Sequence, residues 1–155
     1  MQAGQVLPAG TWDAARAIDR VLIDWDNRHR RRLTLTCESG RALLLDLPHA
    51  TRLRDGDGLQ TATGVIRVCA RPEALLEIHA HDAAALARIA WHLGNRHLPV
   101  QLMGERIRIR ADHVIAAMIA GLGGHAHAVQ APFDPEAGAY AGAAQHHHHH
   151  HHDDH

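Results

Sequence analysis

The sequence contains no lysine, only two cysteines, and few aromatic residues: three Trp, one Tyr and one Phe among 155 residues. With aromatic residues at 3% and hydrophobic residues at 46%, the core must be built mainly from alanine, leucine, isoleucine and valine. The scarcity of aromatic side chains argues against a platform on which RNA bases stack. The formal net charge is -1, so the composition lacks the basic excess typical of proteins that bind nucleic acid or membranes.

Long apolar runs and paired-cysteine motifs are also absent from the sequence. No stretch approaches the roughly 20 apolar residues that span a bilayer, and no signal peptide is recognisable at the first residues. Cys37 and Cys69 each fall in a strand-like run without Cys-x-x-Cys spacing, so we interpret them as free thiols with a structural role. These features favour a cytoplasmic protein.

Histidine, in contrast, is abundant, with 17 residues. Eight of them stand at the end of the chain: His146, His147, His148, His149, His150, His151, His152 and His155. Neutral imidazole is the commonest metal ligand in proteins and suits zinc, copper and nickel. Residues 141–155 cannot bury enough apolar surface to order themselves, so we predict a disordered, metal-binding His-rich tail. The tract alone leaves open that it is a purification tag.

The first part of the chain, residues 1–71, is predicted to form a β-rich domain. Runs rich in β-forming or alternating residues occupy positions 21–25, 33–38, 42–47 and 64–70. The sequence Asp55-Gly56-Asp57-Gly58 lacks the further ligands of a calcium loop and is interpreted as a turn. The basic run at 28–32 precedes an alternating strand, and we interpret it as a solvated hairpin tip rather than a phosphate-binding patch.

The second part, residues 72–140, alternates between strand and helix patterns. Strands are predicted at 74–79, 98–103, 106–110 and 125–131. Asp82 and Asp112 can each cap a helix, and glycines at Gly94 and Gly123 are expected to end the two helices. The order βαββαβ is typical of a ferredoxin-like domain, so the chain as a whole is predicted to be α+β.

Individual histidines of this second part differ in their suitability as metal ligands. His92 and His97 cannot chelate one ion from a continuous helix, because a spacing of five residues separates them by about 140° around the axis. If Gly94 ends the helix, His97 lies in an exposed turn and is the better ligand candidate, whereas His92 is interpreted as a helix-end packing or capping group. His113 opens the second helix, where the positive end of the helix dipole keeps its ring neutral and able to coordinate.

Two His-x-His pairs, His79-Ala80-His81 and His125-Ala126-His127, place both imidazoles on one face if they lie in strands. We interpret them as small and polar residues alternating on edge strands. A metal-dependent hydrolase would need a closed set of ligands and a general base in a shaped pocket, and the large barrels that carry such pairs need about 250 residues. No nucleophile or nucleotide-binding motif is present, so an enzyme is not expected.

Several segments resemble one known family. The block Gly94-Asn95-Arg96-His97-Leu98-Pro99-Val100-Gln101, the helix start Asp112-His113-Val114, and the run at 132–140 resemble UreE, the urease accessory nickel metallochaperone. The resemblance extends from the β-rich first part through the His-rich tail, and it raises the expectation that the tail is native.

The resemblance implies a homodimer formed through the C-terminal domain, in which the two copies of His97 hold one Ni²⁺ ion. It also implies that His113 is an additional ligand, although the accompanying histidine found two positions earlier in some members is Ala111 here. The tail histidines would feed or complete the central site, and Zn²⁺ or Cu²⁺ would also bind in vitro. The partners implied are the urease accessory GTPase and its complex with apo-urease.

Two other readings remain open at this stage. The first is a nickel or zinc storage protein, in which the tail binds the metal and no recipient protein takes it up. The second is an RNA-binding ferredoxin-like domain carrying a tag, which the shortage of aromatic residues disfavours.

Overall fold

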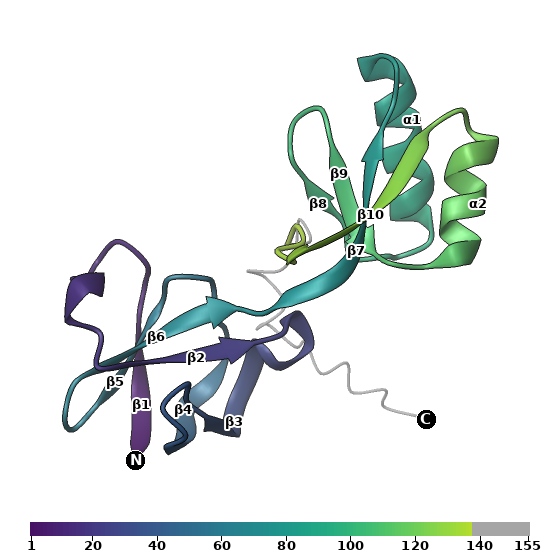
Figure 1. The fold of residues 1–155 in the computed structure, drawn as a ribbon. Helices are drawn as coiled ribbons and strands as arrows, with labels where there is room; N and C mark the ends of the chain where they lie inside the picture. The colour runs from purple at the N-terminus through teal and green to yellow at the C-terminus, as the bar shows by residue number, and fades with distance from the viewer. Residues whose placement is uncertain (138–155) are drawn as a thin grey trace, which may run out of the picture.

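The computed structural model of the chain describes residues 1–137 and consists of two sheets that follow one another along the sequence (Figure 1). The first belongs to a β-rich N-terminal domain, and the second carries two helices, so the predicted α+β class is confirmed. The predicted tail, with its eight histidines, lies outside the described residues. Among residues 1–137, no helix is long and apolar enough to cross a membrane.

The N-terminal domain is a curled six-stranded sheet in the order β2-β6-β5-β1-β4-β3. Its strands are β1 (Gln2–Leu7), β2 (Asp19–Ile23), β3 (His29–Thr36), β4 (Ala42–Arg52), β5 (Gly58–Thr61) and β6 (Val65–Ala70). Short 3-10 helices lie at Ala14–Arg16 and Trp25–Asn27. The sheet surrounds a core made mainly of Leu, Ile and Val side chains, which include Val21, Leu43, Leu45, Leu59 and Ile66.

The turn predicted at Asp55–Gly58 is confirmed. Gly56 has a φ of 87°, a left-handed conformation that glycine adopts without strain. The Asp57 carboxylate accepts hydrogen bonds from the backbone N–H of Ala9 and Arg54, and the Asp55 carboxylate accepts one from Ala70. Both carboxylates therefore hold backbone groups, as turn residues do.

The prediction of a hairpin tip at 28–32 was wrong, whereas the predicted exposure to solvent holds for residues 29–32 and fails only for Arg28. β3 already begins at His29, and Arg28 is only 2% exposed. Its guanidinium donates hydrogen bonds to the backbone carbonyls of Ile23 in the N-terminal domain and Phe133 in the C-terminal domain. Arg28 thus lies between the two domains, where its buried guanidinium is paired with backbone carbonyls of both.

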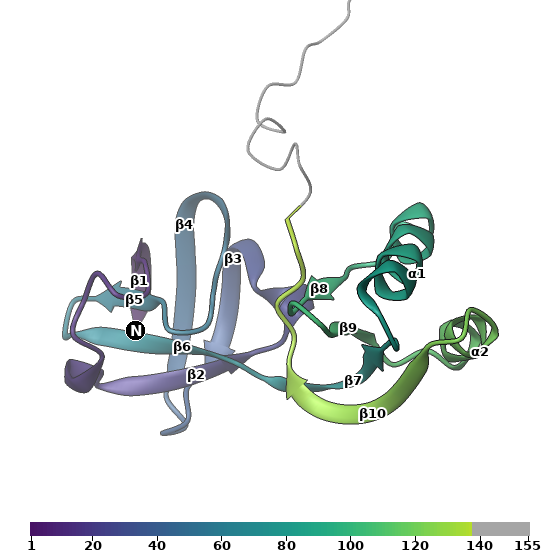
Figure 2. The ribbon, with the colours of Figure 1, turned by 90° about the horizontal axis from the view of Figure 1, so that it is seen from above.

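Trp25 makes a second set of contacts between the domains. Its ring lies edge-on to Phe133, with centroids 5.9 Å apart, and the guanidinium group of Arg110 lies 4.6 Å from its centroid. Arg52, from the same domain as Trp25, lies 5.1 Å from the centroid. Arg110 also forms a two-point ion pair with Asp26. Together with the single residue that separates β6 from the next strand, these contacts hold the two domains side by side (Figure 2).

The C-terminal domain has the predicted ferredoxin-like arrangement, with sheet order β10-β7-β9-β8. Its elements are β7 (Pro72–His79), α1 (Ala83–Asn95), β8 (Gln101–Leu102), β9 (Ile107–Arg110), α2 (His113–Gly121) and β10 (His125–Pro132). Both helices lie on one face of the sheet (Figure 2). Isoleucines of the strands, such as Ile78 and Ile107, pack there against Ile89, Leu93 and Ile119 of the helices.

Some boundaries differ from those predicted. Helix α1 continues through Gly94 and ends at Asn95, so Gly94 is not its end, although His97 does lie in the turn beyond it. The strand predicted at 98–103 is reduced to two residues, because the segment before Gln101 packs its apolar side chains against the core without pairing. In the N-terminal domain, β1 and β5 were not predicted at all.

Candidate metal centre

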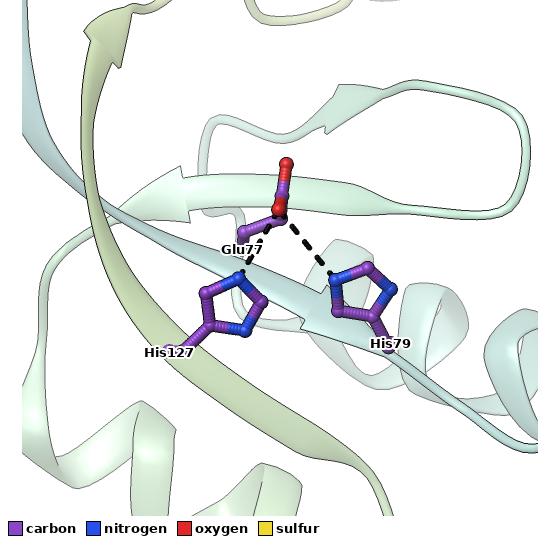
Figure 3. A group of neighbouring side chains, drawn as sticks. All are labelled: Glu77, His79 and His127. Carbon is purple, nitrogen blue, oxygen red and sulfur yellow. Dashed lines mark hydrogen bonds and ion pairs between the residues drawn. The ribbon is translucent and has the colours of Figure 1, made fainter.

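Three ligand-type side chains converge on the C-terminal sheet: Glu77, His79 and His127 (Figure 3). The Nε2 atom of His127 lies 3.2 Å from Glu77 Oε2, and the Nε2 atom of His79 lies 3.5 Å from the same oxygen. The two imidazole rings stack nearly parallel, with centroids 5.1 Å apart and an interplanar angle of 9°. The three ligand atoms all lie within 4.8 Å of one another.

The strand register explains why these residues meet. β7 and β10 are antiparallel neighbours in which Glu77 is paired with His127 and His79 with His125. Residues two apart in a strand share a face, so Glu77 and His79 project to the same side as the directly opposite His127. The neighbouring residues Leu76 and Ile78 face the helices, which places the cluster on the face of the sheet away from them.

This arrangement corrects the interpretation of the His-x-His pairs. β10 is an edge strand, as expected for His125 and His127, but β7 lies inside the sheet between β10 and β9. β7 ends at His79, so His81 is outside the strand, and its Nε2 lies 3.4 Å from Asp82. The structure therefore joins one histidine from each pair across two strands and adds a glutamate that the sequence analysis did not consider.

Two arginines from β9 and the turn before it hold the carboxylate of Glu77. Arg106 Nη1 and Arg108 Nε each donate a hydrogen bond of 3.1 Å to Oε1, which leaves Oε2 facing the histidines. Glu77 is 6% exposed, and burial is the largest influence on its pKa and raises it. The hydrogen bond from Arg108 and the charges of Arg106 and Arg108 outweigh burial, so the pKa of Glu77 lies below its ordinary value. The carboxylate is therefore ionised at neutral pH.

His97, the principal predicted ligand, lies at the other end of the C-terminal domain. It is exposed and follows the C-cap residue Arg96, and its N–H donates to Gly94 O at 3.1 Å. Its φ of 56° is left-handed, and among residues 1–137 no other non-glycine residue has a positive φ. Helices most often place glycine at this position, because a side chain there is strained.

His113 is the first residue of α2 and is also exposed. The Asp112 side chain caps this helix by accepting hydrogen bonds from Val114 and Ile115, as predicted. Leu98 and Asp112, the neighbours of His97 and His113, line one small cavity, so the two histidines lie at the same end of the domain. Among residues 1–137, the structure does not group either of them with other ligands of the same chain.

His92 and the cysteines occupy structural positions. His92 is half-buried near the end of α1, with its ring edge-on to Trp91 at 5.0 Å, consistent with a packing role. Cys37 is buried, Cys69 is half-buried, and both are free thiols, as predicted. Burial raises the pKa of both thiols, which keeps them protonated and makes them poor metal ligands.

Comparison with known proteins covers almost the whole chain. The family model described as the N-terminal domain of the UreE urease accessory protein matches residues 3–71, and that of its C-terminal domain matches residues 73–155. A Urease accessory protein UreE from Rhodopseudomonas palustris is 58% identical over 81% of this chain, but the match covers only 59% of that relative.

Two further relatives bear the same name. The match to a Bradyrhizobium protein has 54% identity and covers 91% of this chain and 68% of the relative. The match to a Beijerinckia indica protein has 49% identity and covers 94% of this chain and 84% of the relative. The chain therefore belongs to the UreE urease accessory protein family, whose members assist another protein rather than being catalytic enzymes themselves.

Proposed function

We propose that this protein is a cytoplasmic nickel metallochaperone, which captures Ni²⁺ and delivers it for assembly of the urease metallocentre. In this proposal the protein is a homodimer joined through its C-terminal domain, and one His97 from each copy holds a shared ion. His113 is an additional ligand at the same end of the domain. The tail histidines His146–His152 and His155 capture nickel and pass it to the shared site.

The observation that carries this proposal is the backbone of His97. His97 has a φ of 56° and lies just after the end of a helix, at a position where glycine is the least strained residue. Residues held in strained backbone conformations cluster at functional sites, which supports a role for His97 beyond folding. Metal coordination supplies such a requirement, because an exposed imidazole in a rigid turn can meet its copy across a two-fold axis.

A site of this kind also fits delivery. Two imidazoles leave most coordination positions of a nickel ion open, so ligands of a recipient can enter before those of His97 leave. Imidazole alone does not select nickel, since the general order of affinities favours copper over nickel and zinc. The choice of nickel therefore rests on membership of the urease accessory family, and we expect Zn²⁺ and Cu²⁺ to bind in vitro.

Transfer of the ion separates a chaperone from a metal store. Nickel-loaded protein is mixed with the metal-free urease accessory GTPase and GTP, the two proteins are separated by gel filtration, and nickel is measured in each fraction. We expect a nickel-dependent complex and movement of nickel to the GTPase. Nickel that stays with this protein at every GTPase concentration would contradict delivery and favour storage.

A further inference from the structure

We propose that Glu77, His79 and His127 form a second divalent-cation site, complete within one chain, that takes Zn²⁺ or Ni²⁺ independently of His97. The site lies on the open face of the C-terminal sheet, at the end of β7 from which α1 starts. Helix α1 then runs back over 13 residues, a length of about 20 Å, before it reaches His97. One ion cannot contact both places in the same chain.

The spacing of the ligand atoms suits a transition-metal ion. Ligands that lie 2.0–2.2 Å from a zinc ion are about 3.0–3.5 Å from one another in tetrahedral or octahedral geometry. The distances from Glu77 Oε2 to the Nε2 atoms of His127 and His79 are 3.2 and 3.5 Å. An ion can therefore enter between these atoms with small side-chain movements, since both imidazoles already direct Nε2 to the same oxygen (Figure 3).

The surroundings of Glu77 resemble those of a metal-binding carboxylate. Ligating carboxylates are usually oriented by hydrogen bonds to the oxygen that does not bind the metal. Arg106 and Arg108 occupy Oε1 in this way and leave Oε2 directed at the two imidazoles, whose contacts with this oxygen a bound cation would replace. Their positive charges oppose a bound cation, so we expect a site of moderate affinity that depends strongly on both imidazoles.

The chemistry of the three ligands limits which ions can bind. Two imidazole nitrogens and one carboxylate oxygen suit zinc and nickel, whereas Ca²⁺ and Mg²⁺ prefer sites made only of oxygen. The side chains of His79 and His127 are 39% and 54% exposed, so water can fill the remaining coordination positions. An ion held in this way exchanges with solvent and needs no second copy of the chain.

The test uses a full-length background variant in which the eight tail histidines are replaced by glutamine, and His97 and His113 by asparagine. This removes the ligands of the proposed nickel-delivery function, so failure of that function does not affect the result. Isothermal titration with Zn²⁺ and Ni²⁺ is expected to find one ion per chain. Adding His79→Gln or His127→Gln is expected to weaken binding at least tenfold, since even changes outside the ligand set cost about 10–100-fold.

His81→Gln is the matched control, because His81 belongs to the same His-x-His pair as His79 but lies outside the cluster. It is expected to leave the affinity unchanged. NMR of the histidine rings in the background variant supplies a second measurement, which needs no substitution at His79, His81 or His127. One equivalent of Zn²⁺ is expected to shift the His79 and His127 signals and not that of His81. The proposed site would be overturned if the background variant bound no ion, or if His81→Gln lowered the affinity as much as His79→Gln or His127→Gln. It would also be overturned if Zn²⁺ left the His79 and His127 signals unshifted.

Discussion

The two ends of the C-terminal domain present histidines in different ways. At one end, two neighbouring strands bring Glu77, His79 and His127 within 4.8 Å of one another. At the other, His97 and His113 stand in a turn and at a helix start, exposed and without a third ligand in the same chain among the described residues. The first set of ligands is brought together by the fold of the described residues, whereas the proposed function completes the second set with ligands from a second copy of the chain.

This difference determines how many ions are expected per chain and whether each site keeps its geometry without a bound ion or a partner chain. A cluster built into a sheet is expected to take one ion per chain and to keep its geometry when empty, because Arg106 and Arg108 hold Glu77. A site formed at a two-fold axis by one histidine from each chain takes one ion per two chains. Such a site exists only in the dimer. The following predictions test the difference, beginning with the largest expected effect.

Replacement of His97 by glycine is expected to separate metal binding from stability. The shared nickel site should be lost completely, while relief of the left-handed strain should raise the free energy of unfolding by up to about 1 kcal/mol. Nickel titration and chemical denaturation measure the two effects. His92→Ala serves as the control and is expected to lower stability more than nickel affinity. Equal loss of tight nickel binding in both variants would argue against a specific role for His97.

Removal of residues 146–155 is expected to lower the number of nickel ions bound per dimer and to leave one tighter shared site. The reason is that His97 lies outside the deleted segment, and the tail contributes many weak ligands. Calorimetric titration of the intact and truncated proteins measures both classes. A truncated protein that binds no nickel would mean that the tail alone held the metal and that neither end of the domain is a site.

Replacement of Glu77 by glutamine is expected to have the smallest effect, a loss of about 1–2 kcal/mol in the metal-free protein near pH 7. The substitution removes the ionic hydrogen bonds that Glu77 accepts from Arg106 and Arg108. The two arginines are partly exposed, which limits the stabilisation that these hydrogen bonds contribute. The pKa of Glu77 is lowered on folding, so this stabilisation is present above the ordinary value of 4.5 and is lost as the pH falls further through the folded-state pKa.

Urea denaturation of both proteins in the presence of a chelator, between pH 3 and 7, measures this difference. The curves for the native protein and Glu77→Gln are expected to converge toward the acid end. A constant difference across the range would contradict the ionic origin of the effect.

The fold of the C-terminal domain was predictable because its elements are local. The caps Asp82 and Asp112 and the apolar periodicity of the helices lie within single segments of sequence, and the structure confirms them. β1 was not predicted, because Gln2–Leu7 has weak β propensity and becomes a strand only by pairing with β4 and β5. Arg28 was misjudged for a related reason, since its burial depends on Phe133, far along the chain.

Among the metal ligands, the sequence alone identified the candidates that stand out locally: the histidine tract and the exposed turn at His97. It also defined the family, because the block from Gly94 to Gln101 is contiguous. Tertiary structure alone decided that His97 is left-handed and that His79 belongs with His127 rather than His81. The physical reason is strand register: an antiparallel pairing brings together residues 50 positions apart, such as Glu77 and His127, and no local pattern encodes that pairing.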